Sequence, residues 1–259
     1  MNIISKPTAI ILAAGQGTRL RPLTNEIPKC MVEVGNKPIL NRQLDTLTAA
    51  GVEKIIVVTG YRQEKIDDPR ITKVYNEEYA STNMIYSLFC AEEHLKGNIL
   101  ICYGDIIYSQ KVLAKVLNTK HDITVASDED WFAYWSERCD DPLDDAETFQ
   151  KGEDGKVKSL GQKPESKDDV EGQFIGLIKL SPNGCEELHT VYHACKDDQE
   201  CSENAWGSGR PLANAYMTDI MNYFASMGKL HYQPINRVWF EVDNRRDLAI
   251  AEKQKHTLL

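Results

Sequence analysis

The residues of this chain that could do chemistry begin with one short stretch near its start. The apolar run Ala9-Ile10-Ile11-Leu12 leads into Ala13-Ala14-Gly15-Gln16-Gly17-Thr18-Arg19-Leu20-Arg21-Pro22, and Pro28-Lys29 follows soon after. Two glycines one residue apart allow a sharp turn and a close approach of backbone N–H groups to a ligand. Such donors beside flexible cations just beyond a strand suit the phosphates of a nucleotide. The stretch therefore predicts a polyphosphate-binding loop.

Commoner glycine-rich loops fit this stretch less well. A dinucleotide-binding loop needs a third glycine where the chain has Leu20, which disfavours a nicotinamide-dependent oxidoreductase. A Walker A loop needs Gly-Lys-Ser/Thr after its second glycine, and that motif is missing here. A plain surface turn would not need Arg19, Arg21 and Lys29 together.

Two carboxylates follow separate apolar runs later in the chain. Asp105 ends the run at residues 98–104, and Asp243 ends the run at 238–242. Two acids that converge from separate strand ends, opposite a polyphosphate loop, would suit Mg²⁺ bound partly through substrate oxygens. Taken singly, each aspartate is equally well explained as a turn residue or a helix N-cap.

Alternating strands and helices must position these residues. The predicted strands are residues 9–12, 31–34, 54–59, 72–75, 98–103, 123–126, 156–160, 174–178, 230–232 and 238–242. The predicted helices are residues 38–50, 63–66, 83–95, 110–117, 211–228 and 245–255. This alternation predicts an α/β fold with a doubly wound, mostly parallel, Rossmann-like sheet, whose ligands bind beyond the carboxyl ends of the strands. A smaller antiparallel insertion on the substrate side is expected from strands 156–160 and 174–178.

Length and composition indicate one globular domain over residues 1–259. We expect a nucleotide-binding part at 1–127, an acceptor-binding part at 128–237, and a metal-ligand strand with a closing helix at 238–259. The formal charge of −9 argues against nonspecific binding of nucleic acid. No apolar run is long enough to span a membrane, and residues 1–7 are too short and polar for a signal peptide, so a cytoplasmic location is expected. A homodimer is one possible assembly of the chain.

The seven cysteines lack CxxC pairs and are expected to be reduced thiols in such a location. Cys185, His189 and His193 are spaced so that a helix would place them on one face, where they could hold a metal ion. Leu188 and Val191 make the same segment an ordinary amphipathic helix with solvent-facing histidines, and both interpretations stay open.

The motifs together resemble a known family. The opening string, Pro28-Lys29, Gly104-Asp105 and Glu241-Val242-Asp243 are similar to the sugar-nucleotide pyrophosphorylase group of nucleotidyltransferases, over almost the full length. Residues 75–79 and 82–88 resemble its phosphocholine cytidylyltransferase-like branch. The resemblance implies transfer of CMP from CTP to a small phosphorylated acceptor (phosphoglutamine, phosphocholine or a phosphono-amine), with release of pyrophosphate. It also implies a place in capsule or cell-surface polysaccharide biosynthesis.

The resemblance further implies roles for individual residues. Arg19 and Lys29 would be the catalytic cations, and Asp105 and Asp243 would hold Mg²⁺. The nucleotide site would comprise Leu12, Ala13, Ala14, Gly15, Gly17, Thr18, Tyr79, Asn83 and Gly104. Residues 81–86 depart from the Pro-Leu-Gly-Thr-Ala-like stretch of hexose-using members, which favours CTP and disfavours a sugar 1-phosphate. A non-catalytic regulatory relative remains the alternative from another class.

The acceptor site is expected in the second half of the chain, and two chemistries stay open. A choline-type cation would favour an aromatic box, although aromatic residues so spaced are more often part of a core. The candidates for that box are Trp131, Tyr134, Trp135 and Trp206. An amino-acid-like acceptor would instead need opposite charges close together. The candidates for that site are Arg138, Glu147, Glu171 with Gly172, and Arg210.

Overall fold

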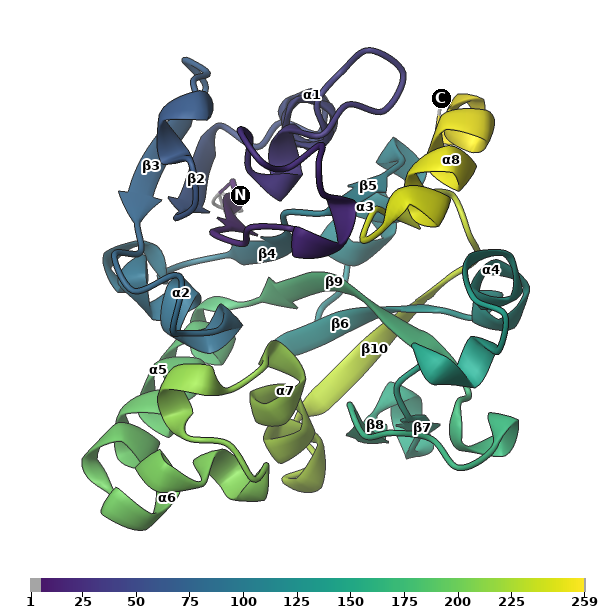
Figure 1. Ribbon diagram of the computed structural model, residues 1–259. Helices are drawn as coiled ribbons and strands as arrows, with labels where there is room; N and C mark the ends of the chain where they lie inside the picture. The colour runs from purple at the N-terminus through teal and green to yellow at the C-terminus, as the bar shows by residue number, and fades with distance from the viewer. Residues whose placement is uncertain (1–5, 259) are drawn as a thin grey trace, which may run out of the picture.

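The computed structural model describes residues 6–258, and a seven-stranded sheet forms its centre (Figure 1). From one edge to the other, the strands are β10 (Leu230–Ile235), β6 (Ile123–Asp128), β9 (Gln173–Leu180), β4 (Ile99–Tyr103), β1 (Thr8–Ala13), β2 (Lys54–Thr59) and β3 (Ile71–Tyr75). The neighbours pair in parallel, except that β9 runs antiparallel to both β4 and β6. The predicted α/β class with a mostly parallel sheet is confirmed.

Helices cover both faces of this sheet (Figure 1). One face carries α1 (Ile39–Ala49), α3 (Gln110–Leu117), α4 (Trp131–Arg138) and α8 (Arg245–Gln254). The other carries α2 (Met84–Cys90), α5 (Pro182–Asp197) and α7 (Met217–Ser226), and the short α6 (Gln199–Glu203) follows α5. Because successive strand residues point to opposite faces, Ile10 and Ile11 of β1 belong to different hydrophobic clusters. This is why the central strands are continuous apolar runs.

Two small antiparallel sheets lie beside the main one. In the first, β5 (Ile106–Tyr108) pairs with β11 (Trp239–Glu241), and the N–H of Val242 donates to the carbonyl of Asp105 at 3.0 Å. This pairing places Asp105, which follows β4, next to Asp243, which follows β11. In the second, β7 (Phe149–Lys151) pairs with β8 (Val157–Leu160).

A small antiparallel sheet is present as expected, but its pairing differs from the expected one. The expectation paired residues 156–160 with 174–178, but β8 pairs with β7, and β9 enters the central sheet. Ile175, Leu177 and Ile178 explain the difference, because they are buried on both faces of β9. A two-stranded surface sheet could not cover both of those faces.

Three other predicted elements differ in detail. Residues 31–34 are not a strand, because the 3₁₀ turn Lys29–Met31 occupies its start and leaves a single bridge from Glu33 to Pro38. The helix expected at 83–95 ends at Cys90, and a separate turn, Glu92–His94, lets both Ala91 and Leu95 remain buried. The helix expected from Pro211 begins only at Met217, where Asp219 accepts the N–H of Tyr216 in a capping box.

The cysteine expectation is wrong for one pair. Cys195 and Cys201 form a disulfide that links the end of α5 to α6, whereas the remaining five cysteines are free thiols. Within residues 6–258, no helix has the length and apolar content needed to cross a membrane. The signal-peptide expectation concerned residues 1–7, of which residues 1–5 lie outside the described residues.

A buried carboxylate joins the end of β6 to the segment before β11. Asp128 is fully buried and accepts hydrogen bonds from the indole of Trp239 at 2.7 Å and from the backbone N–H of Arg237 at 3.0 Å. Asp128→Ala leaves these donors without a partner in the core and is expected to lower the free energy of unfolding by about 3 kcal/mol. Urea unfolding measures the change. Asp130→Ala, at an exposed position, is the control, and it should change the free energy of unfolding by less than about 0.5 kcal/mol. Equal effects of the two variants would contradict this account.

Candidate active site

A cavity of about 500 Å³ opens at the carboxyl ends of β1 and β4. All of the residues predicted for nucleotide, catalytic and metal roles line it: Leu12, Ala13, Ala14, Gly15, Gly17, Thr18, Arg19, Lys29, Tyr79, Asn83, Gly104, Asp105 and Asp243. Cys30, Thr82, Met84 and Ser87 line it as well, and the sequence did not single them out for this cavity. The volume is of the size that holds a drug-sized or cofactor-sized ligand.

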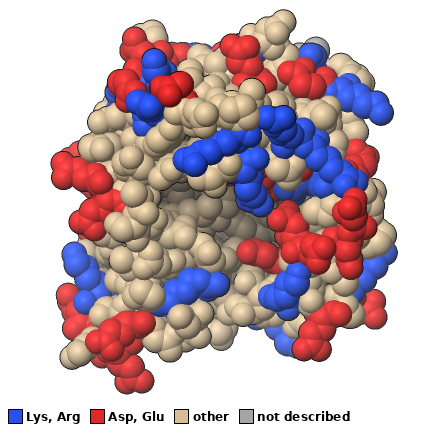
Figure 2. All heavy atoms as spheres, in the orientation of Figure 1, with Lys and Arg blue, Asp and Glu red and all other residues tan. Residues whose placement is uncertain are grey.

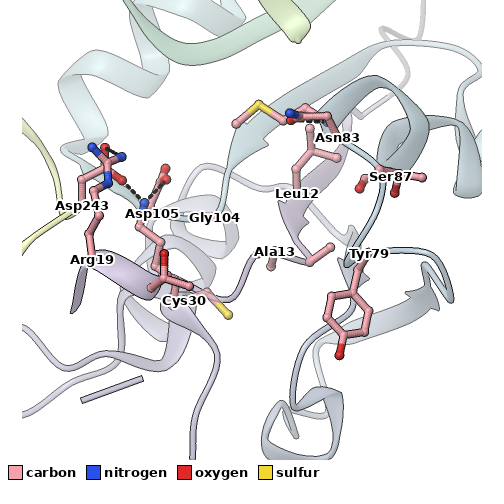
Figure 3. Close-up of a pocket in the computed structure, with 17 residues that line it drawn as sticks. Leu12, Ala13, Arg19, Cys30, Tyr79, Asn83, Ser87, Gly104, Asp105 and Asp243 are labelled. Carbon is pink, nitrogen blue, oxygen red and sulfur yellow. Dashed lines mark hydrogen bonds and ion pairs between the residues drawn. The ribbon is translucent and has the colours of Figure 1, made fainter. Parts of the chain in front are cut away.

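The cavity has a charged end and a less polar end (Figure 3). Arg19, Asp105 and Asp243 gather at the first, and Leu12, Asn83, Tyr79 and Ser87 lie toward the second. Figure 2 shows a hollow on the face seen in Figure 1, with basic side chains along its upper rim and acidic ones at its right. A ligand with an anionic tail and a flat, weakly polar head fits such a division.

The glycine loop is held by its own backbone and by Thr24. Gly17 adopts a left-handed conformation with φ of +65°, and its carbonyl accepts the Thr24 hydroxyl at 2.7 Å. A Cβ at Gly17 would lie 2.8 Å from the Cβ of Lys29, so the loop and the lysine pack in direct contact. Glycine at position 17 is therefore required both by the turn and by the position of Lys29.

The charged end is built around the ammonium group of Lys29. Its Nζ lies 2.6 Å from Oδ2 of Asp105 and also bonds Oδ1 of Asp243, while Arg19 bonds the other oxygen of Asp243 at 2.7 Å. Burial by itself would lower the pKa of Lys29, but Asp105 and Asp243 raise it above its ordinary value. Burial by itself would raise the pKa of Asp243, but Lys29 and Arg19 together lower it. Lys29 and Asp243 are therefore both ionised near neutral pH.

A third cation, Arg138, supports this cluster from the protein interior. Arg138 of α4 is buried and lies 2.8 Å from Oε2 of Glu241 and 3.0 Å from Oδ1 of Asp247. Burial, with Asp243 and Asp105 adding to it, raises the pKa of Glu241 well above its usual value, and Arg138 opposes that shift. Asp247 in turn accepts the backbone N–H of Asp243 at 3.0 Å, so Arg138 and Asp247 fix the position of Asp243.

The carboxylates present a donor set that fits a divalent cation. One oxygen from each of Asp105, Glu241 and Asp243 lies within 4.8 Å of the others. Oδ1 of Asp105 is buried and has no hydrogen-bond partner among residues 6–258. Mg²⁺ and similar hard cations prefer carboxylate oxygens, so an unpartnered oxygen beside a second aspartate suits such an ion.

A second cavity of about 240 Å³ adjoins the first and shares Met84 and Asp243 with it. Its other lining residues are Tyr103, Trp135, Asp145, Glu147, Gln173, Phe174, Tyr216, Thr218 and Glu241. Aromatic rings and carboxylates thus form the wall. Glu147 lines this concave wall. Its burial there, together with the nearby Asp219, raises its pKa to about 7, and Arg210 opposes the shift. This favours the neutral form, whose stabilising effect on the fold is lost as pH rises through about 7.

Comparison with known proteins identifies the family. The MobA-like NTP transferase domain matches residues 9–166, more than half of the chain. The CTP:phosphoglutamine cytidylyltransferase of Campylobacter jejuni is 34% identical over 255 residues, which cover 93% of this chain and 98% of that protein. This chain belongs to the MobA-like NTP transferase family. Nucleotidyltransferases of this family generally use a divalent metal ion.

Two further proteins are similar to this chain. The choline-phosphate cytidylyltransferase of Streptococcus pneumoniae is 33% identical over 135 residues, covering 51% of this chain and 55% of that protein. The solved CTP:phosphocholine cytidylyltransferase from the same species has a TM-score of 0.73 at 24% identity, covering 96% of this chain and 98% of that one. The structural likeness shows that the two share a fold.

Several residues expected to contact the acceptor lie outside both cavities of this NTP transferase. Trp131 is in the core, where its indole donates to the carbonyl of Val170 at 3.0 Å, and Tyr134 is fully buried. Arg138 supports Asp243 from within the protein. The aromatic box is therefore not formed as expected, and Trp135 is the one member of the four that lines the second cavity.

The other expected acceptor residues are divided. Glu147 lines the second cavity, but Glu171 is exposed and accepts the backbone N–H of Lys151 at 2.6 Å. Gly172 packs so closely against Ser127 that a Cβ would lie 2.2 Å from its hydroxyl oxygen. Arg210 pairs with Asp219 at 3.2 Å and affects the second cavity through its charge.

The sequence reasoning missed Tyr103, Phe174 and Glu241 as cavity residues. Tyr103 and Phe174 read as strand residues, and nothing in the sequence marks the cavity they share, where their rings meet edge to face. Glu241 carried a usable signal, because it lies two residues before Asp243, and alternate residues of a strand share a face.

The close contact between β1 and the turn after β4 gives a stability test. A Cβ at Gly104 would lie 2.6 Å from the carbonyl oxygen of Leu12 and 3.0 Å from Cα of Ala13. Because both are backbone atoms, Gly104→Ala must part the two segments, and we expect a loss of about 1–3 kcal/mol in the free energy of unfolding. At Gly15 a Cβ meets nothing within 4 Å, so Gly15→Ala is the matched control. Denaturant unfolding compares them, and an unaffected Gly104→Ala protein would contradict the contact.

Proposed function

We propose that this protein is a cytidylyltransferase that moves CMP from CTP to a small phosphorylated acceptor bearing an amine, with release of pyrophosphate. The observation that carries the proposal is the pair of adjoining cavities that share Asp243. One has a glycine loop and cations suited to a triphosphate, and the other has carboxylates and aromatic rings suited to a cation. Similarity to the Campylobacter jejuni CTP:phosphoglutamine cytidylyltransferase over nearly the whole chain supports the choice of CTP.

The nucleotide would lie with its phosphates at the charged end of the first cavity. Backbone N–H groups of the loop from Ala14 to Thr18 and the guanidinium of Arg19 are the donors for the phosphate oxygens. Leu12 and Ala13 offer apolar contact for the nucleoside. Asn83, whose side-chain oxygen caps α2 by accepting the N–H of Met84, keeps its amide N–H₂ available for the base.

The reaction needs no covalent enzyme intermediate. An oxygen of the acceptor's phosphate attacks the α-phosphorus of CTP, a new P–O bond forms, the bond to the β-phosphate breaks, and pyrophosphate leaves with the bonding electron pair. Lys29 pairs with Asp105 and Asp243, and it would bridge the α-phosphate of CTP and the incoming phosphate of the acceptor. Positioning and charge stabilisation then account for catalysis.

We assign the divalent ion of this family to Mg²⁺ at Asp105 and Asp243, on the strength of the unpartnered oxygen of Asp105. When bound, such an ion neutralises the negative charge of the triphosphate and of the leaving pyrophosphate. Glu241, paired with Arg138, lies next to these carboxylates, and Asp243 and Asp105 add to the burial that raises its pKa.

The acceptor would lie in the second cavity with its phosphate toward Asp243 and its cationic end toward Glu147. Asp145, Glu147 and Glu241 make this wall acidic, and Tyr103, Trp135 and Phe174 offer ring faces. An ammonium group gains charge attraction from the acids and contact with the ring faces, whereas the hydroxyl groups of a sugar would gain only hydrogen bonds to the carboxylates. The wall therefore favours an amine-bearing acceptor over a sugar 1-phosphate.

Substitution of the central lysine tests the reaction. Lys29→Ala should fold but lose turnover by at least about a hundredfold, because the developing charge on the phosphates loses its cation. Pyrophosphate release is measured with each of the four nucleotides, Mg²⁺, and a panel of phosphorylated amines, amides and sugars. Lys37→Ala, which removes an exposed lysine paired with Asp45, is the control and should keep wild-type rates. Near wild-type turnover in Lys29→Ala would remove the lysine from the mechanism, and silence of the native protein across the whole panel would favour a regulatory relative.

The raised pKa of Glu147 gives a pH test of the acceptor assignment. As pH rises from 6 to 8, Glu147 ionises through its pKa of about 7. The KM for an amine-bearing acceptor should then fall by about tenfold, because a carboxylate attracts the ammonium more strongly than the acid does. The pH dependence of KM measured on Glu147→Gln gives the contribution of the acceptor's own phosphate, which is subtracted from that of the native protein. If the two profiles coincide, Glu147 does not recognise the acceptor's cation.

A further inference from the structure

A cluster of two histidines and a carboxylate lies outside both cavities. Nε2 of His193 is 2.6 Å from Oε1 of Glu92, and Nε2 of His189 contacts the same oxygen. One ligand atom from each residue lies within 4.8 Å of the other two. The histidines come from successive turns of α5, and Glu92 comes from the turn that follows α2. Three potential ligands therefore converge from two separate elements.

The metal site considered from the sequence combined Cys185 with these histidines, but the structure does not place the cysteine beside them. Cys185 is buried, and its thiol faces the carbonyl of Gly97 at 3.4 Å. Glu92, which is 97 residues before His189 in the chain, takes the place expected for the cysteine. No sequence spacing could reveal this carboxylate, because only the packing of α2 against α5 brings it there.

The chemistry of the cluster suits a transition metal. Two imidazole nitrogens on one helix face, four residues apart, with one carboxylate, form a nitrogen-rich set that Zn²⁺ and similar ions prefer, whereas Mg²⁺ prefers oxygen. The three side chains are between about a third and a half exposed, which leaves access for an ion and room for water ligands.

The surroundings hold the cluster in place. Phe89 of α2 stacks on Tyr192 of α5 with ring centroids 3.4 Å apart, and it meets the ring of His193 edge to face. The backbone of both elements is thus fixed next to the ligands, which reduces the ordering that an ion would have to impose. An ion here would join α5 to the C-terminal end of α2, the helix whose N-terminal residues Asn83, Met84 and Ser87 line the nucleotide cavity.

We propose that Glu92, His189 and His193 form a binding site for a divalent transition-metal ion of the Zn²⁺ type, separate from the carboxylate site of the reaction. The ion completes its coordination with water and stabilises the contact between α2 and α5. The site does not depend on the proposed function, because none of its ligands lines either cavity.

Titration calorimetry of the full chain with ZnCl₂ at pH 7.5, in millimolar MgCl₂, tests the site. We expect one ion to bind per chain at this site and the melting temperature to rise with zinc. His189→Ala and His193→Ala should each weaken binding by tenfold or more, and Glu92→Gln should also weaken it. Lowering the pH to 5.5 should weaken binding to the native protein, because protons compete for the imidazoles.

Two control variants make the result specific. His94→Ala removes a neighbouring histidine that contacts Lys54 and Glu93 and is not part of the cluster, so it should bind zinc as the native protein does. Asp105→Asn alters the carboxylate site of the reaction and should also keep this zinc site. Circular dichroism of the metal-free variants checks that each is folded. Equal zinc affinity in the native and His189→Ala/His193→Ala proteins, or no binding by the native protein up to 1 mM zinc, would overturn the proposal.

Discussion

The rest of this structure depends on one electrostatic constraint: three partly buried carboxylates lie close together at the active site and must be compensated by cations. Asp105, Glu241 and Asp243 bring their oxygens within a few ångströms of one another, and like charges so close and so buried cannot all ionise without cations. Lys29 meets this requirement from the cavity side, and Arg138 meets it from the core side. The high pKa of Glu241 shows where compensation stays incomplete, because burial and its acidic neighbours outweigh Arg138. The site is therefore electrostatically organised before any ligand adds its own charge.

The fold supplies this arrangement through a small feature beside the main sheet. The antiparallel pairing of β5 with β11 brings Asp105 and Asp243 together, although 138 residues separate them. The sequence was sufficient for the glycine loop and both aspartates, because each follows an apolar run at a strand end, and for Lys29, because it lies soon after that loop in the chain. It was not sufficient for the pairing itself. Three-residue strands such as β5 carry almost no periodic signal, so their existence follows only from the contacts they make.

The acceptor side was harder to predict for a different physical reason. Trp131 and Arg138 belong to α4, where an aromatic residue and a charged residue look like ligands for a substrate. In the folded protein Trp131 faces the core, and Arg138 is buried because two acids, Glu241 and Asp247, compensate its charge there. A buried ion pair of this kind cannot be told from a surface binding site by composition, since both need the same residue types. The residues that do form the second cavity, such as Tyr103 and Phe174, read instead as ordinary strand residues.

Asp243 has a special position because it belongs to both cavities. On one side it shares Lys29 with Asp105, and on the other it stands beside Glu241 and the acidic wall of the second cavity. A charge added in either cavity changes the balance that Lys29, Arg19 and Arg138 must maintain at this one carboxylate. Under the proposed function, a phosphate in the first cavity and a cationic group at the acidic wall of the second would both act on the charge of Asp243, so occupation of the two cavities would be coupled through this carboxylate.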